Sequence, residues 1–444
     1  MIGKIAKKLK IVLPGFIYDG LKVVYKRLKP MLKTVDKLYF KIKLKKVQAN
    51  HKKALEKVRK KEKIKVAFFL IHESVWKYDG VYKLMERQER FEPIVIVCPY
   101  IVYGEEIMLH DMNQAYQGFK KKGYNVIKTL GEDGKWLDVK KEIQPDIVFF
   151  TNPHNLTRNE YTIDEYLDVL TCYVQYSFNV SYLNQANYNK PFHNFIWKIF
   201  TETSIHLKLS IEYSLNKGSN CIVTGYPGTD GLLDSNTSNK YVAKSLDIRK
   251  RIIWSPHHTI NENDSNLGYS NFLAYAEFFQ QLVETYEKKV YFIFKPHPIL
   301  KAKLYLHPNW GRSKTDDYYK FWEVQINTSL NEGEYIDLFL SSDGLINDSG
   351  SYLAEYLFTS KPSLFMLRND EVQTHFNQFG RNCLDIVYKS YSKKDVITFI
   401  EQTILDENDW MFEKRNSFVK EVMLPPNKLT ASENIFNYLK KEIL

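Results

Sequence analysis

From residue 64 onward, short apolar runs alternate with stretches whose apolar residues recur at helical spacing. Continuous apolar runs predict buried strands at 65–71, 93–97, 125–127, 146–150, 172–178 and 221–224. Helical spacing predicts helices at 81–89 and 112–122, and a long helix over 194–216 that ends at Gly218. Alternation of this kind requires a parallel sheet covered by helices on both faces.

The same pattern restarts in the second half of the chain. Strands are predicted at 252–254, 290–294, 345–346 and 363–365, and helices at 271–286, 335–341 and 352–358. Residues 230–248 are rich in Ser, Asn, Thr and Gly, which is typical of an interdomain linker. We therefore expect an α/β protein with two doubly wound, Rossmann-like domains, at 63–235 and 236–444. Helices at 409–420 and 432–444 are expected to cross back to the first domain.

Residues 1–62 differ from the rest in their hydrophobic pattern and charge, and this pattern predicts a basic helical N-terminal arm. Ile2, Ile5, Leu9 and Val12 share one helical face, and lysines mostly occupy the other. Residues 1–65 hold 22 Lys and Arg against four acidic residues, so this segment carries +18 whereas the rest carries −7. An amphipathic basic arm suits an anionic membrane surface. The alternatives are an arm that packs on its own protein or a partner, and nucleic-acid binding. Nucleic acid is disfavoured because the arm lacks interleaved stacking aromatics and the rest of the chain is acidic.

Apolar run lengths and cysteine usage indicate the cellular compartment of the protein. No apolar run approaches the roughly 18–20 residues needed to span a bilayer, and no signal peptide is recognisable. The four cysteines are scattered without a CxxC pair, which fits a reducing cytoplasm. The expected location is therefore cytoplasmic, peripheral on the inner face of the cell membrane.

Candidate chemistry lies directly after the predicted strands, where ligands bind in open α/β sheets. Four of these loops present histidine, although the chain has only 11. The histidines in question are His72, His154, the pair His257 and His258, and His297.

The loop after 345–346 has the clearest physical basis for binding phosphate. Its residues are small or polar and lead into a helix, so backbone N–H groups stay free for an anion: Asn347, Asp348, Ser349, Gly350 and Ser351. Glu355, one turn later, could accept hydrogen bonds from a ribose diol. The simpler alternatives are an ordinary helix N-cap and a solvated glutamate.

The Lys295-Pro296-His297-Pro298 turn restricts the backbone on both sides of one imidazole. Lys295 and His297 could neutralise a diphosphate, and a histidine can act as a general acid towards a leaving phosphate. A strand-ending turn with a satisfied histidine is the alternative. His257 and His258 point in opposite directions if extended, so we expect at most one to face the cleft. No metal-binding motif, GxGxxG or GxxxxGK[ST] loop occurs, which disfavours zinc, dinucleotide oxidoreductases and P-loop NTPases.

These residues resemble a known family. The run from Tyr335 to Glu355, with Lys361-Pro362 after it, is similar to the signature of the CDP-glycerol glycerophosphotransferases. Lys295-Pro296-His297-Pro298 is similar to their histidine-proline motif, and Gly225-Tyr226-Pro227 with Asp230 to a motif of their first domain. The resemblance covers about 64–400 and implies a GT-B-like fold, a CDP-linked alditol donor and a lipid-linked acceptor.

Two departures from the family pattern stand out. Many members carry Trp-His-Gly in the first domain, whose histidine is a candidate base, whereas this chain has 173–178 without histidine. Where many members have Pro-Thr-Trp-Arg or a similar run, this chain has Pro256-His257-His258-Thr259.

The expected function is transfer of an alditol phosphate from a CDP-linked donor to a membrane-linked glycan or polymer in teichoic-acid or capsule synthesis. The donor would be held by His257, His258, Lys295, the 347–351 loop and Glu355. His297, His154 and His72 are the catalytic candidates, with no metal ligand and no cofactor beyond the donor. The rivals are a GT-B glycosyltransferase that uses a nucleotide sugar, and an inactive membrane-associated scaffold.

Overall fold

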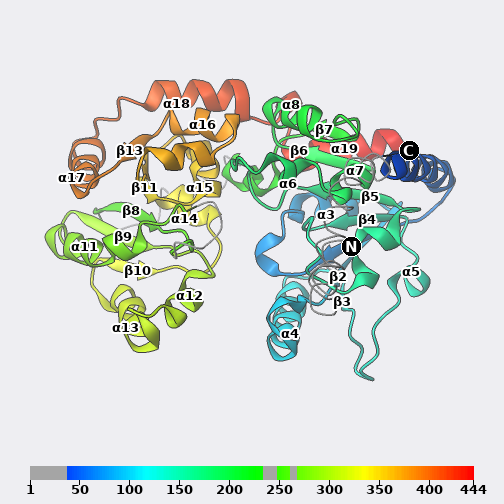
Figure 1. Cartoon of the computed structure of the whole chain (residues 1–444), viewed down its shortest axis with the longest axis horizontal. Coiled ribbons are helices and arrows are strands. Elements are labelled where there is room, and N and C mark those ends of the chain that lie inside the picture. The colour runs from blue at the N-terminus through cyan, green and yellow to red at the C-terminus, as the bar shows by residue number, and fades with distance from the viewer. Residues whose placement is uncertain (1–37, 234–247, 261–267) are drawn as a thin grey trace, which may run out of the picture.

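The computed structural model describes residues 38–233, 248–260 and 268–444. Two lobes lie side by side, each built around one parallel sheet (Figure 1). The N-terminal 37 residues, the middle of the predicted linker and residues 261–267 lie outside the described residues.

The first lobe contains a seven-stranded sheet in the order β3-β2-β1-β4-β5-β6-β7. Its strands are β1 (Ile64–Leu70), β2 (Phe91–Val97), β3 (Val126–Lys128), β4 (Ile147–Phe150), β5 (Leu170–Val174), β6 (Lys198–Thr201) and β7 (Cys221–Val223). The helices are α3 (Asp79–Glu86), α4 (Glu105–Lys121), α5 (Val139–Glu142), α6 (Asn184–Tyr188), α7 (Pro191–Phe195), α8 (Ser204–Tyr213) and α9 (Asp230–Leu233). Every pairing is parallel, as expected for strands linked by crossover helices.

The second lobe contains a six-stranded sheet in the order β10-β9-β8-β11-β12-β13. Its strands are β8 (Lys250–Ser255), β9 (Val290–Phe294), β10 (Thr328–Leu330), β11 (Gly344–Asn347), β12 (Ser363–Met366) and β13 (Tyr388–Ser390). The helices are α11 (Phe272–Thr285), α12 (Leu300–Leu306), α13 (Gly311–Val324), α14 (Ile336–Ser341), α15 (Gly350–Glu355), α16 (Gln378–Leu384) and α17 (Lys393–Thr398). In both sheets the order in which strands are added reverses beside the first strand, at β1/β4 and at β8/β11. This is the doubly wound topology expected from the sequence.

One predicted element is wrong. The segment 194–216 is not a single helix, because β6 (Lys198–Thr201) lies inside it between α7 and α8. The run Phe195-Ile196-Trp197-Lys198-Ile199-Phe200 is apolar enough for either a buried strand or a buried helix, and periodicity alone cannot separate the two. The edge strands β10 and β13 have three residues each and were not predicted.

Of the two C-terminal helices expected to cross back, the last one returns to the first lobe, and the other stays on the second lobe. Helix α18 (Phe412–Phe418) starts on the second lobe, and α19 (Ala431–Ile443) lies against α3 (Figure 1). The Asp230 carboxylate accepts hydrogen bonds from the first backbone N–H groups of α19, at 2.8 Å from Ala431 and 3.0 Å from Ser432. Gly225 has φ +88°, and a Cβ there would lie 2.7 Å from Pro425. The Gly-Tyr-Pro and Asp230 motif therefore anchors the returning chain.

Residues 38–58 form a helix that packs on the first lobe. Its buried residues include Leu44, Val47 and Val58, and Phe40 stacks on Phe195 with ring centroids 4.9 Å apart. Lys43 forms a 3.0 Å ion pair with Asp164. This part of the predicted arm thus contributes to the core. Within the described ranges, no helix is long and apolar enough to cross a bilayer.

A continuous apolar core joins the two lobes. Residues 175–182, which follow β5 and which we call the docking segment, reach into the second lobe. Phe178 stacks on Phe379 at 5.1 Å and is buried. Asn377 donates its backbone N–H to the Val180 carbonyl at 2.8 Å and its side-chain amide to the Asn179 carbonyl at 3.0 Å. These contacts stabilise the arrangement of the two lobes.

Candidate active site

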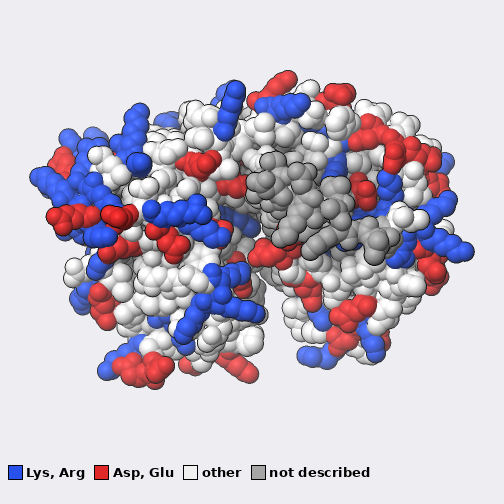
Figure 2. All heavy atoms as spheres, turned by 180° about the vertical axis from the view of Figure 1, so that it is seen from behind, with Lys and Arg blue, Asp and Glu red and all other residues white. Residues whose placement is uncertain are grey.

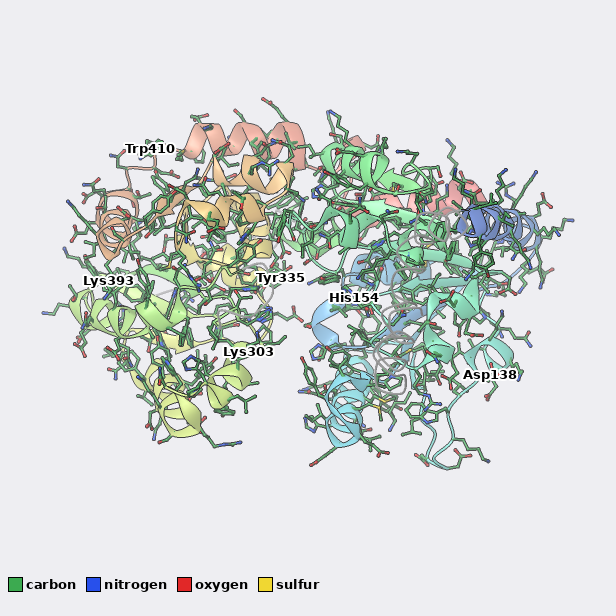
Figure 3. The ribbon with its side chains drawn as sticks, in the orientation of Figure 1. Asp138, His154, Lys303, Tyr335, Lys393 and Trp410 are labelled. Atoms are coloured by element: carbon green, nitrogen blue, oxygen red, sulfur yellow. The ribbon has the colours of Figure 1, made fainter. Side chains whose placement is uncertain are left out.

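A notch lies between the two lobes. Figure 2 shows this notch on the molecular surface, with basic and acidic side chains interspersed on both lobes. In Figure 3, His154 lies on the inner side of the first lobe, and Tyr335 and Lys303 lie on the inner side of the second. The topology therefore brings the predicted loops of both domains to one cleft.

Three histidines of the second lobe form a cluster. The ring centroid of His258 lies 4.3 Å from that of His257 and 4.3 Å from that of His297. The centroids of His257 and His297 lie 5.2 Å apart. His257 and His258 follow β8, and His297 follows β9, so adjacent parallel strands deliver them to the same edge. Both rings of the pair therefore contact His297.

Hydrogen bonds fix which ring nitrogen carries the proton in two of these rings. The Ile299 N–H donates to Nδ1 of His297 at 3.2 Å, so the neutral ring has its proton on Nε2. The Thr259 hydroxyl oxygen already accepts from the N–H groups of Tyr269 and Ser270, at 3.0 and 3.3 Å. Its own proton is therefore available to Nδ1 of His257, 3.0 Å away. Both rings thus keep an Nε2–H group for a ligand.

His257 and His297 are neutral at physiological pH. Burial lowers the pKa of His297 to about 3 and lowers that of His257 well below its usual range, and the neighbouring imidazole of His258 acts in the same direction. The same three residues form the one group of His, Cys, Asp and Glu side chains, among those described, whose ligand atoms lie within 4.8 Å of one another. A metal ion at Nε2 would require the opposite tautomer and would cost His297 its bond from Ile299. The geometry favours N–H donation to an anion.

Asp348 positions the backbone next to the histidine cluster. It is buried, and its two oxygens accept the backbone N–H groups of His257 and Asn271, both at 2.6 Å. Burial raises the pKa of Asp348 to about 7, although these hydrogen bonds oppose the shift. Asp348 therefore fixes the loop that carries His257, and its oxygens are occupied by the protein.

The other residues of the 347–351 loop surround the end of β11. Asn347 accepts the Ser349 N–H through its side-chain oxygen at 3.2 Å, which shapes the turn. Gly350 is packed tightly, because a Cβ there would lie 3.0 Å from a methyl group of Val180 on the docking segment. Ser351 is partly exposed. Of the loop, Ser351 and the backbone remain as groups that a phosphate could reach.

Lys295 is the cationic residue predicted for this site. Its side chain is buried and donates to the Gly333 carbonyl. Burial lowers the pKa of the Lys295 ammonium to about 8, and Glu334 and Glu332 oppose the shift. The group is still charged at neutral pH, close to the histidine-bearing turn.

Glu355 lies where the lobes meet. It is 2 % exposed, and one carboxylate oxygen lies 3.5 Å from the Phe178 N–H of the docking segment. Burial raises the pKa of Glu355, and the positive charge of Lys77 opposes this shift. The Lys77 ammonium also lies 5.3 Å from the ring centroid of Tyr335. A ribose could reach Glu355 only if Lys77 and the docking segment moved.

The first lobe contributes His72 and His154. His72 accepts the Ser74 N–H at Nδ1 at 3.2 Å. The Lys190 ammonium lies 2.7 Å from Nδ1 of His154. The pKa of His154 is lowered to about 4, first because the ring is partly desolvated and second because Lys190 is charged. Lys190 has no sequence motif around it, and only the fold brings it to His154.

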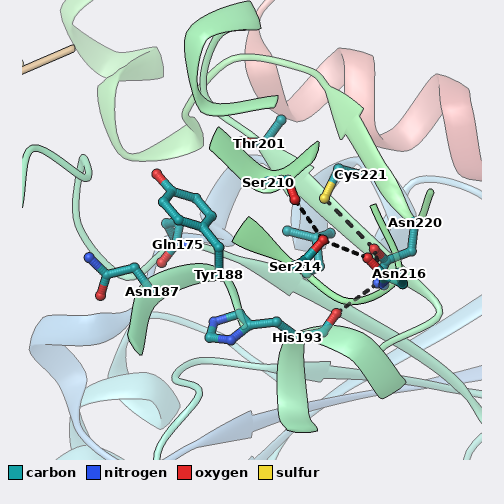
Figure 4. Close-up of a pocket in the computed structure, with 11 residues that line it drawn as sticks. Gln175, Asn187, Tyr188, His193, Thr201, Ser210, Ser214, Asn216, Asn220 and Cys221 are labelled. Atoms are coloured by element: carbon teal, nitrogen blue, oxygen red, sulfur yellow. Dashed lines mark hydrogen bonds between the residues drawn. The ribbon is translucent and has the colours of Figure 1, made fainter. Parts of the chain in front are cut away.

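A separate polar cavity lies inside the first lobe (Figure 4). Asn216, Asn220 and Ser214 bond to one another and to the backbone there, and Asn220 donates to the carbonyls of His193 and Ile196. This network holds the loops beside β6 and β7. It lies away from both switch points.

Comparison with known proteins supports the same fold and identifies the family. The model of the CDP-glycerol:poly(glycerophosphate) glycerophosphotransferase family matches residues 197–439. No curated protein matches the chain.

Solved structures share the two-domain fold. A variant of the wall teichoic acid polymerase TagF is 13% identical, covers 94% of this chain and 98% of its own, and has a TM-score of 0.59. TagF soaked with CDPG has a TM-score of 0.55 at 11% identity, covering 94% and 98%. The UDP-GlcNAc 2-epimerase from Neisseria meningitidis bound to UDP-GlcNAc has a TM-score of 0.53 at 16% identity, covering 85% of this chain and 100% of its own. At these identities the likeness shows the GT-B-like fold. Because the family model matches more than half of the sequence, the chain belongs to the CDP-glycerol glycerophosphotransferase family and is a transferase of that type.

Proposed function

We propose that the protein transfers glycerol phosphate from CDP-glycerol to a lipid-linked polymer in the synthesis of a teichoic-acid-like cell-surface polymer. The observation that carries the proposal is the cluster of His257, His258 and His297 at the β8/β11 switch point. Two of its rings present Nε2–H donors, and Lys295 adds a positive charge. Such a site suits the diphosphate of a CDP-linked donor.

The reaction needs positioning and charge stabilisation more than covalent help from the protein. An acceptor hydroxyl attacks the phosphorus that bears glycerol, in line with the leaving CMP. His297 and its neighbours donate hydrogen bonds to the phosphate oxygens as negative charge shifts towards CMP. A neutral imidazole acts here as a hydrogen-bond donor, since the lowered pKa of His297 leaves it uncharged.

The first lobe supplies the groups nearest to the acceptor. We assign His72 and His154 to this side of the cleft. Each has its Nδ1 engaged by a donor, Ser74 or Lys190. Either ring would therefore have to change tautomer before it accepted the proton of the attacking hydroxyl at Nε2.

Glu355 is proposed as the ribose partner, reached after the docking segment moves. Its support is its place one turn beyond the 347–351 loop and the absence of a second carboxylate in that turn. The basic residues 1–37 are proposed to hold the enzyme on anionic lipid at the cytoplasmic face of the membrane, where a lipid-linked acceptor resides.

The decisive experiment is a donor panel. Purified protein is incubated with CDP-glycerol, CDP-ribitol and several nucleotide sugars, with and without acceptor, and the released nucleotide is measured. We expect CMP from CDP-glycerol, in an amount that rises with acceptor. Release from a nucleotide sugar alone would favour a glycosyltransferase. No release from any donor would favour an inactive scaffold.

A further inference from the structure

Lys190 is a cation without a counter-ion in the described part of the chain. Its side chain is partly buried, and its ammonium lies 2.7 Å from Nδ1 of His154. Burial lowers the pKa of Lys190, and no described carboxylate forms an ion pair with it or opposes that shift. A partly desolvated ammonium of this kind favours the approach of an anion.

The same contact sets the chemistry of His154. Because the ammonium can only donate, Nδ1 of His154 accepts, and the neutral ring carries its proton on Nε2. Burial first, and the lysine charge second, lower the pKa of His154 and keep the imidazole neutral. His154 and Lys190 together therefore offer hydrogen-bond donors and one positive charge.

His154 of this pair lines a small pocket at the carboxyl ends of β1 and β4. Asn152, Thr157 and Thr162 supply polar atoms to this pocket, and Phe150 and Phe192 supply apolar walls. The Thr157 hydroxyl is buried and has no hydrogen-bond partner among the described residues. A ligand group with a free hydroxyl or oxygen would satisfy it.

We propose that Lys190 and His154 form an anion subsite that binds a phosphate of the acceptor, next to a pocket that takes a hydroxyl-bearing end. This inference rests on the proposed function and narrows it, because it selects acceptors that already carry a phosphodiester. It also makes His154 a positioning group for the acceptor and not the base.

The acceptor is favoured over the donor as the source of the phosphate for a geometric reason. The donor diphosphate has its own donors on the second lobe, in His257, His297 and Lys295. His154 lies on the inner side of the opposite lobe (Figure 3), and Lys190 is in hydrogen-bond contact with it. Two anion sites on opposite walls suit two phosphate-bearing substrates.

The binding test uses the full chain and does not depend on catalysis. Calorimetry would measure the affinity of a short oligo(glycerol phosphate), of glycerol and of inorganic phosphate for wild type, Lys190→Met and Lys190→Arg. We expect Lys190→Met to weaken oligo(glycerol phosphate) binding about tenfold or more, since a charge-assisted bond is lost, and Lys190→Arg to restore most of it. Glycerol should bind weakly to all three. Inorganic phosphate that binds as tightly as the oligomer would show a free-anion site and would overturn the acceptor assignment.

Lys208→Met is the matched control. Lys208 is exposed on α8 of the same lobe, and its substitution should leave oligomer binding unchanged. Equal oligomer affinity in wild type and Lys190→Met would overturn the proposal. So would a Lys190→Met variant that binds CDP-glycerol more weakly and the oligomer normally, because the anion would then be the donor's.

A spectroscopic measurement separates this role from a purely structural one. In ¹⁵N-edited NMR, His154 of the wild type should titrate near pH 4, and Lys190→Met should move its pKa upward because a neighbouring cation is removed. Addition of the oligomer should shift the Nε2–H resonance of His154 in wild type only. An unmoved His154 resonance would refute the subsite. If these binding results hold while the donor panel shows no CMP release, the proposed reaction fails and the subsite stands.

Discussion

At the scale of single residues, hydrogen bonds at Nδ1 set the proton position of three histidines beside the cleft. His72, His154 and His297 each accept at Nδ1, from Ser74, Lys190 and Ile299. Their Nε2–H groups are then donors, and lowered pKa values keep His154 and His297 uncharged at pH 7. Such an array binds anions without the desolvation cost of many buried charges.

The first prediction concerns His297. We expect His297→Ala to lower turnover of CDP-glycerol by at least about 100-fold, because a positioned donor to the transferred phosphate is lost. The unfolding midpoint should change little, since His297 lies in a turn that is partly exposed and its Nδ1 bond, from Ile299, is local. His307→Ala is the control, because His307 makes a similar local bond, from the Asn309 N–H at 3.3 Å. A normal rate for His297→Ala would assign the Pro-His-Pro turn to structure alone.

The second prediction concerns pH and Lys295. The pKa of its ammonium is lowered to about 8, so the charge is present at pH 7 and is lost as the pH rises through that value. We expect the affinity for CDP-glycerol, measured by calorimetry, to fall up to about tenfold between pH 7 and 9.5. Lys295→Met should bind weakly at every pH. Lys301→Met, in the neighbouring helix, should keep the wild-type profile, and a flat wild-type profile would contradict the assignment.

At the scale of elements, part of the family signature acts on the fold. The Lys361 ammonium donates to the carbonyls of Phe339, Leu340 and Ser342, at the C-terminal end of α14. Ser342 also donates to the Phe339 carbonyl, through its N–H and its hydroxyl, and the lysine adds a charged donor that caps the helix end and complements its dipole. The Lys361-Pro362 motif therefore positions the segment that leads into β11 and its loop.

The third prediction follows from this cap. Lys361→Met should lower the free energy of unfolding by roughly 2–3 kcal/mol, because several partly buried carbonyls lose a charged donor. Urea denaturation would measure the loss. Lys389→Met, whose ion pair with Asp385 is long at 3.5 Å, should cost under about 1 kcal/mol. If the two variants were equally stable, Lys361 would have no capping role.

At the scale of the whole molecule, one apolar core spans both lobes. It includes Val58 and Phe68 of the first lobe, Phe178 of the docking segment, and Leu353 and Phe379 of the second. The docking segment overlaps 173–178, where the resemblance to the family places the Trp-His-Gly motif of many members. In this protein that region joins the domains and does not present a histidine to the cleft.

The fourth prediction concerns the N-terminal arm. Residues 1–37 carry ten Lys and Arg against two acidic residues, and each basic residue near anionic lipid contributes roughly 1 kcal/mol. We expect deletion of 1–37 to abolish sedimentation with anionic vesicles and to leave a folded, active transferase. Wild-type binding should weaken steeply with added salt.

Deletion of 1–62 should behave differently. It removes the helix 38–58 with its buried Leu44, Val47 and Val58, so thermal unfolding should occur at a clearly lower temperature. Two truncations that are equally stable would show that this helix adds nothing to the core. A 1–37 deletion that still pellets with vesicles would contradict the membrane role of the arm.

The sequence alone determined the fold class, the position of most strands and the family. These follow from local signals: apolar runs such as 290–294, turn residues after each strand, and the run from Tyr335 to Glu355. The same local signals failed at 194–216, where β6 is a four-residue strand whose partners β5 and β7 are distant in sequence. A short apolar run becomes a strand only when neighbouring strands satisfy its backbone.

For the site, too, the sequence indicated some features and only the tertiary structure decided others. Sequence reasoning located His257, His258, Lys295 and His297, because each follows a strand that ends at the same edge of a parallel sheet. Only the tertiary structure decided the contacts that set their chemistry. The proton of His257 depends on Thr259, the loop of His257 depends on Asp348, and His154 depends on Lys190, 36 residues away in the chain. Proton positions and burial arise from contacts between distant segments, and no local pattern in the sequence encodes them.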